Sequence, residues 1–154
     1  MTKTTDKEKK EKFDEFLMIM DDQLEALEKD AIRHGIRIDR NMESLELLEQ
    51  LFSKMKTEIS KDDIGRLIVY FARYLGEIVI KTFGGHWYLP LEDKKNVNYN
   101  IPVIIGHSPV RDLDFAPISV VRGFSIKKNV GSFRIAIDAQ ISPNPLDLSN
   151  LPDE

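Results

Sequence analysis

Residues 70–91 constrain the fold of this chain most, because a helical pattern changes there to a strand pattern at two glycines. The helical pattern covers residues 61–82, and Gly84 and Gly85 are suited to end it. The aromatic run that follows contains the only tryptophan and favours a strand at residues 86–91. The apolar face of the helix comprises Ile64, Leu67, Ile68, Phe71, Leu75, Ile78 and Val79.

Two more helices are expected before this one. The first begins near residues 9–12 and ends at His34 and Gly35, with apolar residues at three- and four-residue steps. The second is capped by Asn41 and continues to Ile59. The next residues resemble a capping box, with a serine at the N-cap and an aspartate three positions later.

Two small residues inside helix 61–82, Gly65 and Gly76, carry a prediction about packing. Glycine costs about 1 kcal/mol relative to alanine inside a helix. We therefore expect a neighbouring element to approach the helix backbone closely at these two positions.

The C-terminal half contains the other strand signals. The β-branched residues 101–105 predict an antiparallel hairpin with residues 86–91. A further helix is expected to start around Asp114 and Pro117. Residues 132–141 alternate between apolar and polar, which favours a third strand over a short helix. The expected fold class is α+β: three N-terminal helices packed on a small antiparallel sheet, with one further helix.

Length and composition set the domain organisation. The 154 residues suit one domain: a flexible N-terminus at 1–10, a single α+β domain at 11–141 and an irregular acidic tail at 142–154. The absence of cysteine excludes disulfides, thiol catalysis and Cys-ligated zinc. No apolar run approaches the roughly 20 residues that span a bilayer, and the charged N-terminus is unlike a signal peptide. We expect a cytoplasmic protein with no membrane partner.

The charges are distributed unevenly along the chain. Residues 1–60 contain 11 Lys or Arg and 15 Asp or Glu, whereas residues 61–154 contain 11 of each. A pI near 5.5 argues against nucleic acid as the main partner, because phosphate binding needs a concentrated basic face. The acidic half is either an ordinary solvated surface or a docking site for a basic partner.

One ordered polar stripe follows helix 61–82, formed by Arg66, Tyr70, Arg73, Glu77 and Lys81. Three roles are open for Glu77. It accepts hydrogen bonds from backbone N–H groups near the glycine pair or from the Trp87 indole and so stabilises the fold, it is an exposed solvated side chain, or it is a catalytic acid or base.

The aromatic strand and the histidines complete the candidate sites. Trp87 and Tyr88 face opposite sides of a strand, so one is expected in the core and the other is available as a recognition anchor. The glycine pair lacks the spacing of a phosphate loop. His34, His86 and His107 share no metal-binding spacing. We therefore predict no metal, no cofactor and no catalytic residue.

A short motif gives the one family resemblance. The pattern YLGE followed by GGxW resembles small uncharacterised bacterial domains, some of which are immunity proteins of toxin systems. The resemblance covers about residues 60–128 and implies a helix packed on a small sheet, with a binding role and no reaction. The residues that carry it are Tyr74, Leu75, Gly76, Glu77, Gly84, Gly85 and Trp87, followed by 101–104 after the loop and by 115–118 at the start of a helix.

The predicted function is a cytoplasmic bacterial protein-binding module, immunity-like, that neutralises a partner by occlusion and performs no catalysis. One alternative is a small-molecule-binding regulator or enzyme with a pocket between helix 61–82 and the sheet. Another is a structural homo-oligomer that pairs through residues 101–105 or through the first helix. The candidate binding residues are Asp22, Glu25, Glu28, Arg66, Tyr70, Arg73, Glu77, Trp87 and Tyr88; the alternative pocket would be lined by Tyr70, Glu77, Trp87 and Tyr88.

Overall fold

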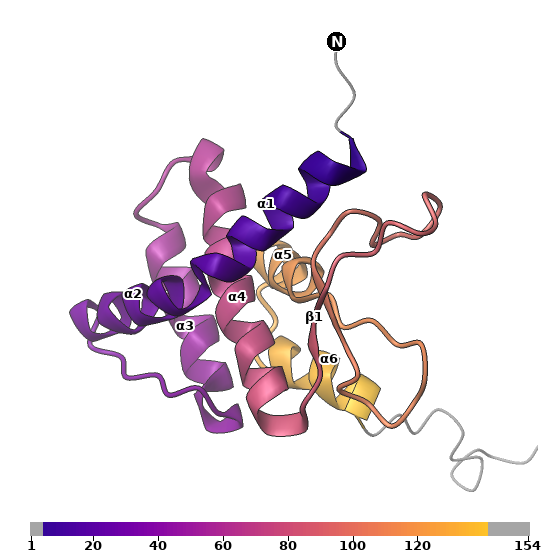
Figure 1. The fold of residues 1–154 in the computed structure, drawn as a ribbon. Coiled ribbons are helices and arrows are strands. Elements are labelled where there is room, and N and C mark those ends of the chain that lie inside the picture. Colours follow the sequence, from indigo (N-terminus) through magenta and orange to yellow (C-terminus); the bar gives the residue numbers. More distant parts are fainter. Residues whose placement is uncertain (1–4, 142–154) are drawn as a thin grey trace, which may run out of the picture.

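The computed structural model describes residues 5–141, which form six α-helices, two short 3₁₀ helices and two strands (Figure 1). The expected fold class, α+β with three N-terminal helices and one further helix, is wrong, because the described part is mostly helical, with four α-helices before a two-stranded sheet and two after it. The elements in chain order are α1 (Asp6–Met18), α2 (Met20–Arg33), η1 (Met42–Ser44), α3 (Leu45–Lys56), η2 (Lys61–Asp63), α4 (Ile64–Phe83), β1 (His86–Tyr88), β2 (Val103–Ile105), α5 (Pro117–Lys127) and α6 (Ser132–Ile141).

The two ends of the chain lie partly outside the described residues. The described range excludes residues 1–4 of the expected flexible N-terminus and the whole expected acidic tail, 142–154. None of the described helices is long and apolar enough to cross a membrane.

Helix α1 begins earlier than expected, at Asp6, because a capping box precedes it. The Glu8 N–H donates to Thr5 Oγ1 at 3.1 Å, and the Thr5 N–H donates to Glu8 Oε1 at 3.0 Å. Two of the free N–H groups at the helix start are thereby satisfied.

The first expected helix is in fact two helices, because the chain bends at Ile19 (φ −95°, ψ 9°). Two helical hydrogen bonds are kept at the bend: the Ile19 N–H donates to the Glu15 carbonyl at 3.2 Å, and the Gln23 N–H donates to the Ile19 carbonyl at 3.0 Å. The bend turns α1 away from the direction of α2 (Figure 1). Both Phe16 and Met20 are buried, so the apolar spacing continues across the bend and predicts a single helix.

Helix α4 is the central element and packs against α2, α3 and α5 (Figure 1). Residues 71–76 are all buried. The expected close approach is confirmed at Gly76, where an added Cβ would lie 2.3 Å from Cζ2 of Trp87. It is wrong at Gly65, which is exposed and has no such neighbour within 4 Å.

The expected antiparallel hairpin is confirmed, with Trp87 of β1 opposite Ile104 of β2. Gly84 and Gly85 between α4 and β1 have φ values of +90° and +94°, which favour glycine. A Cβ on Gly85 would also come within 2.5 Å of the Ile105 carbonyl oxygen. The turn from the central helix into the sheet therefore requires glycine at this position.

The other edge of β2 is already occupied. The Ile104 N–H donates to the Phe115 carbonyl at 2.8 Å, and the Phe115 N–H donates to the Ile104 carbonyl at 2.9 Å. Helix α5 follows with Pro117 in its first turn, as expected, but its N-cap is Ala116 and not Asp114. This bridge uses backbone groups that the predicted pairing of strand 101–105 between copies would need.

Residues 132–141 form helix α6, so the expected third strand is wrong. The carboxylate of Glu49 on α3, which is 2% exposed, accepts hydrogen bonds from the N–H groups of Gly131 at 2.8 Å and Phe133 at 2.9 Å. A carboxylate stabilises a helix N-terminus by satisfying its free N–H groups and by its charge. The buried Phe133 and Ile137 are four residues apart, a spacing that fits a helix face as well as a strand face.

Candidate functional site

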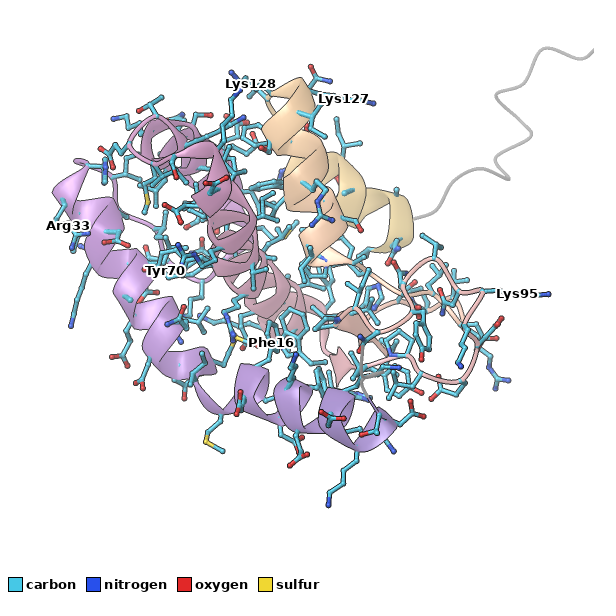
Figure 2. All side chains as sticks on the ribbon, turned by 90° about the horizontal axis from the view of Figure 1, so that it is seen from above. Phe16, Arg33, Tyr70, Lys95, Lys127 and Lys128 are labelled. Carbon is cyan, nitrogen blue, oxygen red and sulfur yellow. The ribbon has the colours of Figure 1, made fainter. Side chains whose placement is uncertain are left out.

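The residues of the expected polar stripe on α4 lie in different environments. Arg66 is exposed. Tyr70, which is labelled in Figure 2, is half-buried. Its hydroxyl donates to Asp30 Oδ2 of α2 at 2.7 Å. Arg73 is only 6% exposed and donates to the backbone carbonyl of Phe16 in α1. The stripe is therefore covered in part by α1 and α2 and does not form one open binding surface.

Glu77 makes one of the fold-stabilising contacts that we expected. The Trp87 Nε1–H donates to Glu77 Oε2 at 2.7 Å. The indole is 9% exposed and packs edge-on against Phe16, with ring centroids 5.0 Å apart. Tyr88 is half-buried, and its hydroxyl donates to Glu92. Trp87 is thus the core residue of the pair, and Tyr88 is the more accessible one.

Glu28, expected on the acidic face, belongs to an internal network. It accepts hydrogen bonds from Arg40 Nε at 3.0 Å and from the Tyr74 hydroxyl at 2.8 Å. Partial burial raises the pKa of Glu28, but the hydrogen bonds from Arg40 and Tyr74 outweigh this and hold it below the ordinary value. Burial, and then the bond to Glu28, raise the pKa of Tyr74, which stays protonated. Glu28 therefore joins α2 to α4 and is not free for a partner.

Asp22 and Glu25 remain on the surface and form part of a continuous exposed stripe across the α1–α2 bend. The residues of this stripe recur at steps of three or four positions along the chain, so their side chains lie on one side of the two helices. Its carboxylates have no ion pair with any residue in 5–141. We call this surface the acidic stripe: Asp14, Leu17, Met18, Asp21, Asp22 and Glu25, all exposed.

The centre of the acidic stripe is apolar. Met18 is 79% exposed and Leu17 is 39% exposed. The apolar spacing of the first expected helix did not indicate an exposed apolar pair here. The available signal was that Met18 is two residues from both Phe16 and Met20, which places it on the opposite side of a helix from these core residues.

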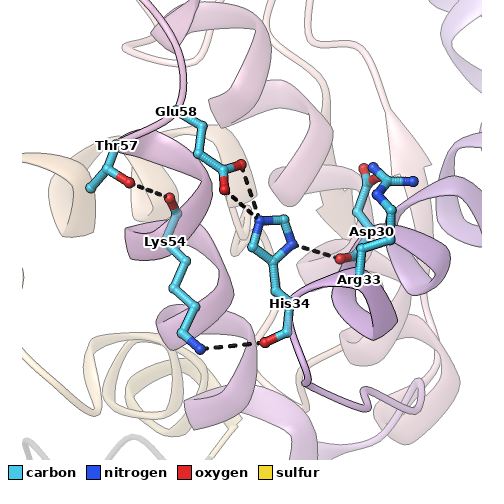
Figure 3. A network of polar contacts seen from close by, with 6 residues as sticks. All are labelled: Asp30, Arg33, His34, Lys54, Thr57 and Glu58. Carbon is cyan, nitrogen blue, oxygen red and sulfur yellow. Dashed lines mark hydrogen bonds and ion pairs between the residues drawn. The ribbon is translucent and has the colours of Figure 1, made fainter.

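A polar network joins the ends of α2 and α3 (Figure 3). His34 Nδ1 lies 2.7 Å from the Asp30 carbonyl oxygen, and His34 Nε2 lies 2.9 Å from Glu58 Oε2. The Lys54 ammonium donates to the His34 carbonyl at 3.4 Å, and the Thr57 hydroxyl donates to the Lys54 carbonyl at 2.7 Å. The polar groups of this network bond to each other, and the contacts connect the C-terminal end of α2 to the C-terminal end of α3.

The three histidines lie in different environments. His34 is in the network above, His86 is exposed on β1, and His107 is buried next to Gln140. Within residues 5–141, no group of three or more His, Cys, Asp or Glu side chains is placed to hold a metal ion.

A groove of about 620 Å³ lies beside α1. None of the four residues expected to line a pocket between the long helix and the sheet contributes to it. The Trp87 ring lies against Gly76 at that interface, whereas the groove is lined by α1, by one side of α4 and α5, and by the chain next to the hairpin.

No protein-family model matches this chain, and neither the curated proteins nor the solved structures contain a match. The resemblance in the YLGE and GGxW motif therefore remains an expectation from the sequence.

Proposed function

We propose that this chain is a protein-binding module that captures a basic partner through the acidic stripe and acts by covering the partner's surface. The observation that carries the proposal is the exposure of Met18, at 79%, between carboxylates that have no ion pair among the described residues.

The composition of the stripe resembles that of a protein interface. Binding surfaces commonly combine an apolar centre with a polar rim, and a few central residues supply most of the binding energy. Methionine is enriched at such surfaces because its flexible side chain adapts to different partners. Leu17 and Met18 would form the centre, with Asp14, Asp21 and Asp22 around it.

The charges favour a basic partner. Unpaired carboxylates on one surface attract a cationic protein and speed its capture, and they repel acidic competitors. The net charge of the chain, −4, acts in the same direction. The resemblance to immunity proteins supports a bacterial, cytoplasmic role in which the partner is a toxin.

The experiment is affinity capture from a lysate of the native host with two charge-matched variants. Asp21 and Asp22 occupy the first turn of α2, and Glu43 and Glu46 are exposed first-turn acids of η1 and α3. Replacing either pair by lysine changes the net charge equally and removes acids from a helix start. We expect a stoichiometric basic protein with wild type and with the Glu43→Lys/Glu46→Lys variant, but not with Asp21→Lys/Asp22→Lys.

An apolar control separates the centre of the stripe from its charges. Met18→Ser is compared with Val97→Ser, since Val97 is 86% exposed and lies far from the stripe in sequence. Only Met18→Ser should weaken the complex. The proposal fails if wild type captures no partner. It also fails if the two charge variants capture the partner equally well, or if Met18→Ser and Val97→Ser have the same effect on the complex.

A further inference from the structure

Arg73 is a buried charge without a counter-ion in the described part of the chain. It is 6% exposed, and none of the ion pairs there includes it. Its Nη1 donates to the Phe16 carbonyl, and its guanidinium carbon lies 4.0 Å from the centroid of the Phe16 ring. Figure 2 labels Phe16 where α1 meets the body of the protein. Burying a cation without an anion is costly, and burial lowers the pKa of Arg73.

The rest of the guanidinium has no acceptor among the described residues. Within residues 5–141, Nε and Nη2 of Arg73 have no hydrogen-bond partner, yet the only fully buried side-chain polar atom without a partner there is His107 Nδ1. The two Arg73 nitrogens therefore retain contact with solvent, and Arg73 contributes to the wall of the 620 Å³ groove.

The rest of the lining is mostly apolar and includes two lysines of α1, Lys9 and Lys12. Lys12 also lines the groove and has no ion pair in the described chain, whereas Glu15 is the one carboxylate in the described lining. A local excess of positive charge in an acidic chain favours an anionic occupant. The apolar wall is formed by Phe13, Phe16, Val69, Leu89, Pro102 and Ile118.

We propose that this groove binds a small amphipathic monocarboxylate, whose carboxylate lies on Arg73 and whose hydrocarbon part lies along the apolar wall. The volume lies within the roughly 300–1,000 Å³ that ligand sites occupy. A planar guanidinium offers two parallel donors to a carboxylate, and Nε and Nη2 are the two donors left free here. This site is independent of the acidic stripe and shares no residue with it.

The experiment is calorimetric titration of the full chain with octanoate, octanol and acetate as probes. Octanoate carries both the charge and the hydrocarbon chain, octanol lacks the charge, and acetate lacks the chain. We expect octanoate to bind and each of the other two to bind about tenfold more weakly or not at all. Equal binding of octanol, or no binding of octanoate, overturns the proposal.

Two variant comparisons locate the site. Arg73→Met keeps most of the side-chain volume and removes no ion pair, so we expect it to fold and to lose about tenfold or more in octanoate affinity. If it does not fold, Lys12→Glu is compared with Lys10→Glu, since both lysines are exposed on α1 but only Lys12 lines the groove. Lys12→Glu should weaken octanoate binding and Lys10→Glu should not. Unchanged affinity in Arg73→Met, or equal loss in both lysine variants, contradicts the assignment.

Discussion

The Trp87 indole rests directly on Gly76, where an added Cβ would lie 2.3 Å from the ring carbon Cζ2. The neighbouring residue, Glu77, accepts the hydrogen bond from the same indole at 2.7 Å. Two consecutive positions of α4 thus determine where the hairpin docks, one by leaving space and the other by a polar contact.

Replacing Gly76 by alanine should destabilise the protein by about 1–3 kcal/mol, because the methyl group forces the indole out of its packed position. Gly65→Ala is the matched control on the same helix. No atom of a neighbouring element lies within 4 Å of its added Cβ, so the better helix propensity of alanine should stabilise the protein by up to about 1 kcal/mol. Urea unfolding of both variants measures the two effects, and equal shifts would contradict the packing described above.

The hydrogen bond between Glu77 and Trp87 should appear as a coupling energy of about 1–3 kcal/mol in a double-mutant cycle of Glu77→Ala and Trp87→Phe. The cycle cancels the packing cost of the smaller ring. A second cycle with Glu77→Ala and Tyr88→Phe is the control, because the Tyr88 hydroxyl binds Glu92. A coupling in the second cycle as large as in the first would show that the hydrogen bond is not its source.

Glu49→Ala should destabilise the protein by about 2–3 kcal/mol, because it leaves the N–H groups of Gly131 and Phe133 without their acceptor. Glu46→Ala on the same helix removes an exposed carboxylate, and a change within about 0.5 kcal/mol is expected there. Hydrogen exchange should also accelerate in α6 of the Glu49 variant. Unchanged exchange in α6 would contradict the capping role.

Stability should decrease in acid through the Glu28 network. The folded-state pKa of Glu28 lies below its ordinary value of 4.5, so its contribution is fully present above that value and is lost as the pH falls through the folded-state pKa. Urea unfolding from about pH 6 to pH 3 measures this. Glu28→Gln should be less stable at the upper end and should lose less stability on acidification. A variant with the same pH dependence as wild type would exclude Glu28 as a contributor.

The features that the sequence predicted correctly depend on local patterns. The hairpin, the glycine turn and the contact between Glu77 and Trp87 all lie within a short stretch of chain. Residue spacing alone indicates that the helix and the strand meet there. Asn41 is also local: its side chain accepts from the Ser44 N–H at 3.1 Å and caps η1, the 3₁₀ turn that leads into α3, whereas the N-cap of α3 itself is Ser44.

The features that were missed depend on contacts between distant residues. The cap of α6 comes from Glu49, more than 80 positions away, and the alternating pattern of 132–141 fits a helix once that cap is present. Arg73 was placed on a polar face, but α1 packs over it through Phe16. The bend at Ile19 directs α1 over Arg73, but it does not interrupt the apolar spacing of the sequence and so could not be predicted from it.

Hydrogen–deuterium exchange of the chain alone and with its captured partner tests the proposed function most directly. The acidic stripe occupies residues 14–25, and binding there should slow backbone exchange in that segment. We expect protection centred on 14–25, and this protection should be lost with Asp21→Lys/Asp22→Lys. Protection confined to α5, α6 or the hairpin, with 14–25 unchanged, would contradict it.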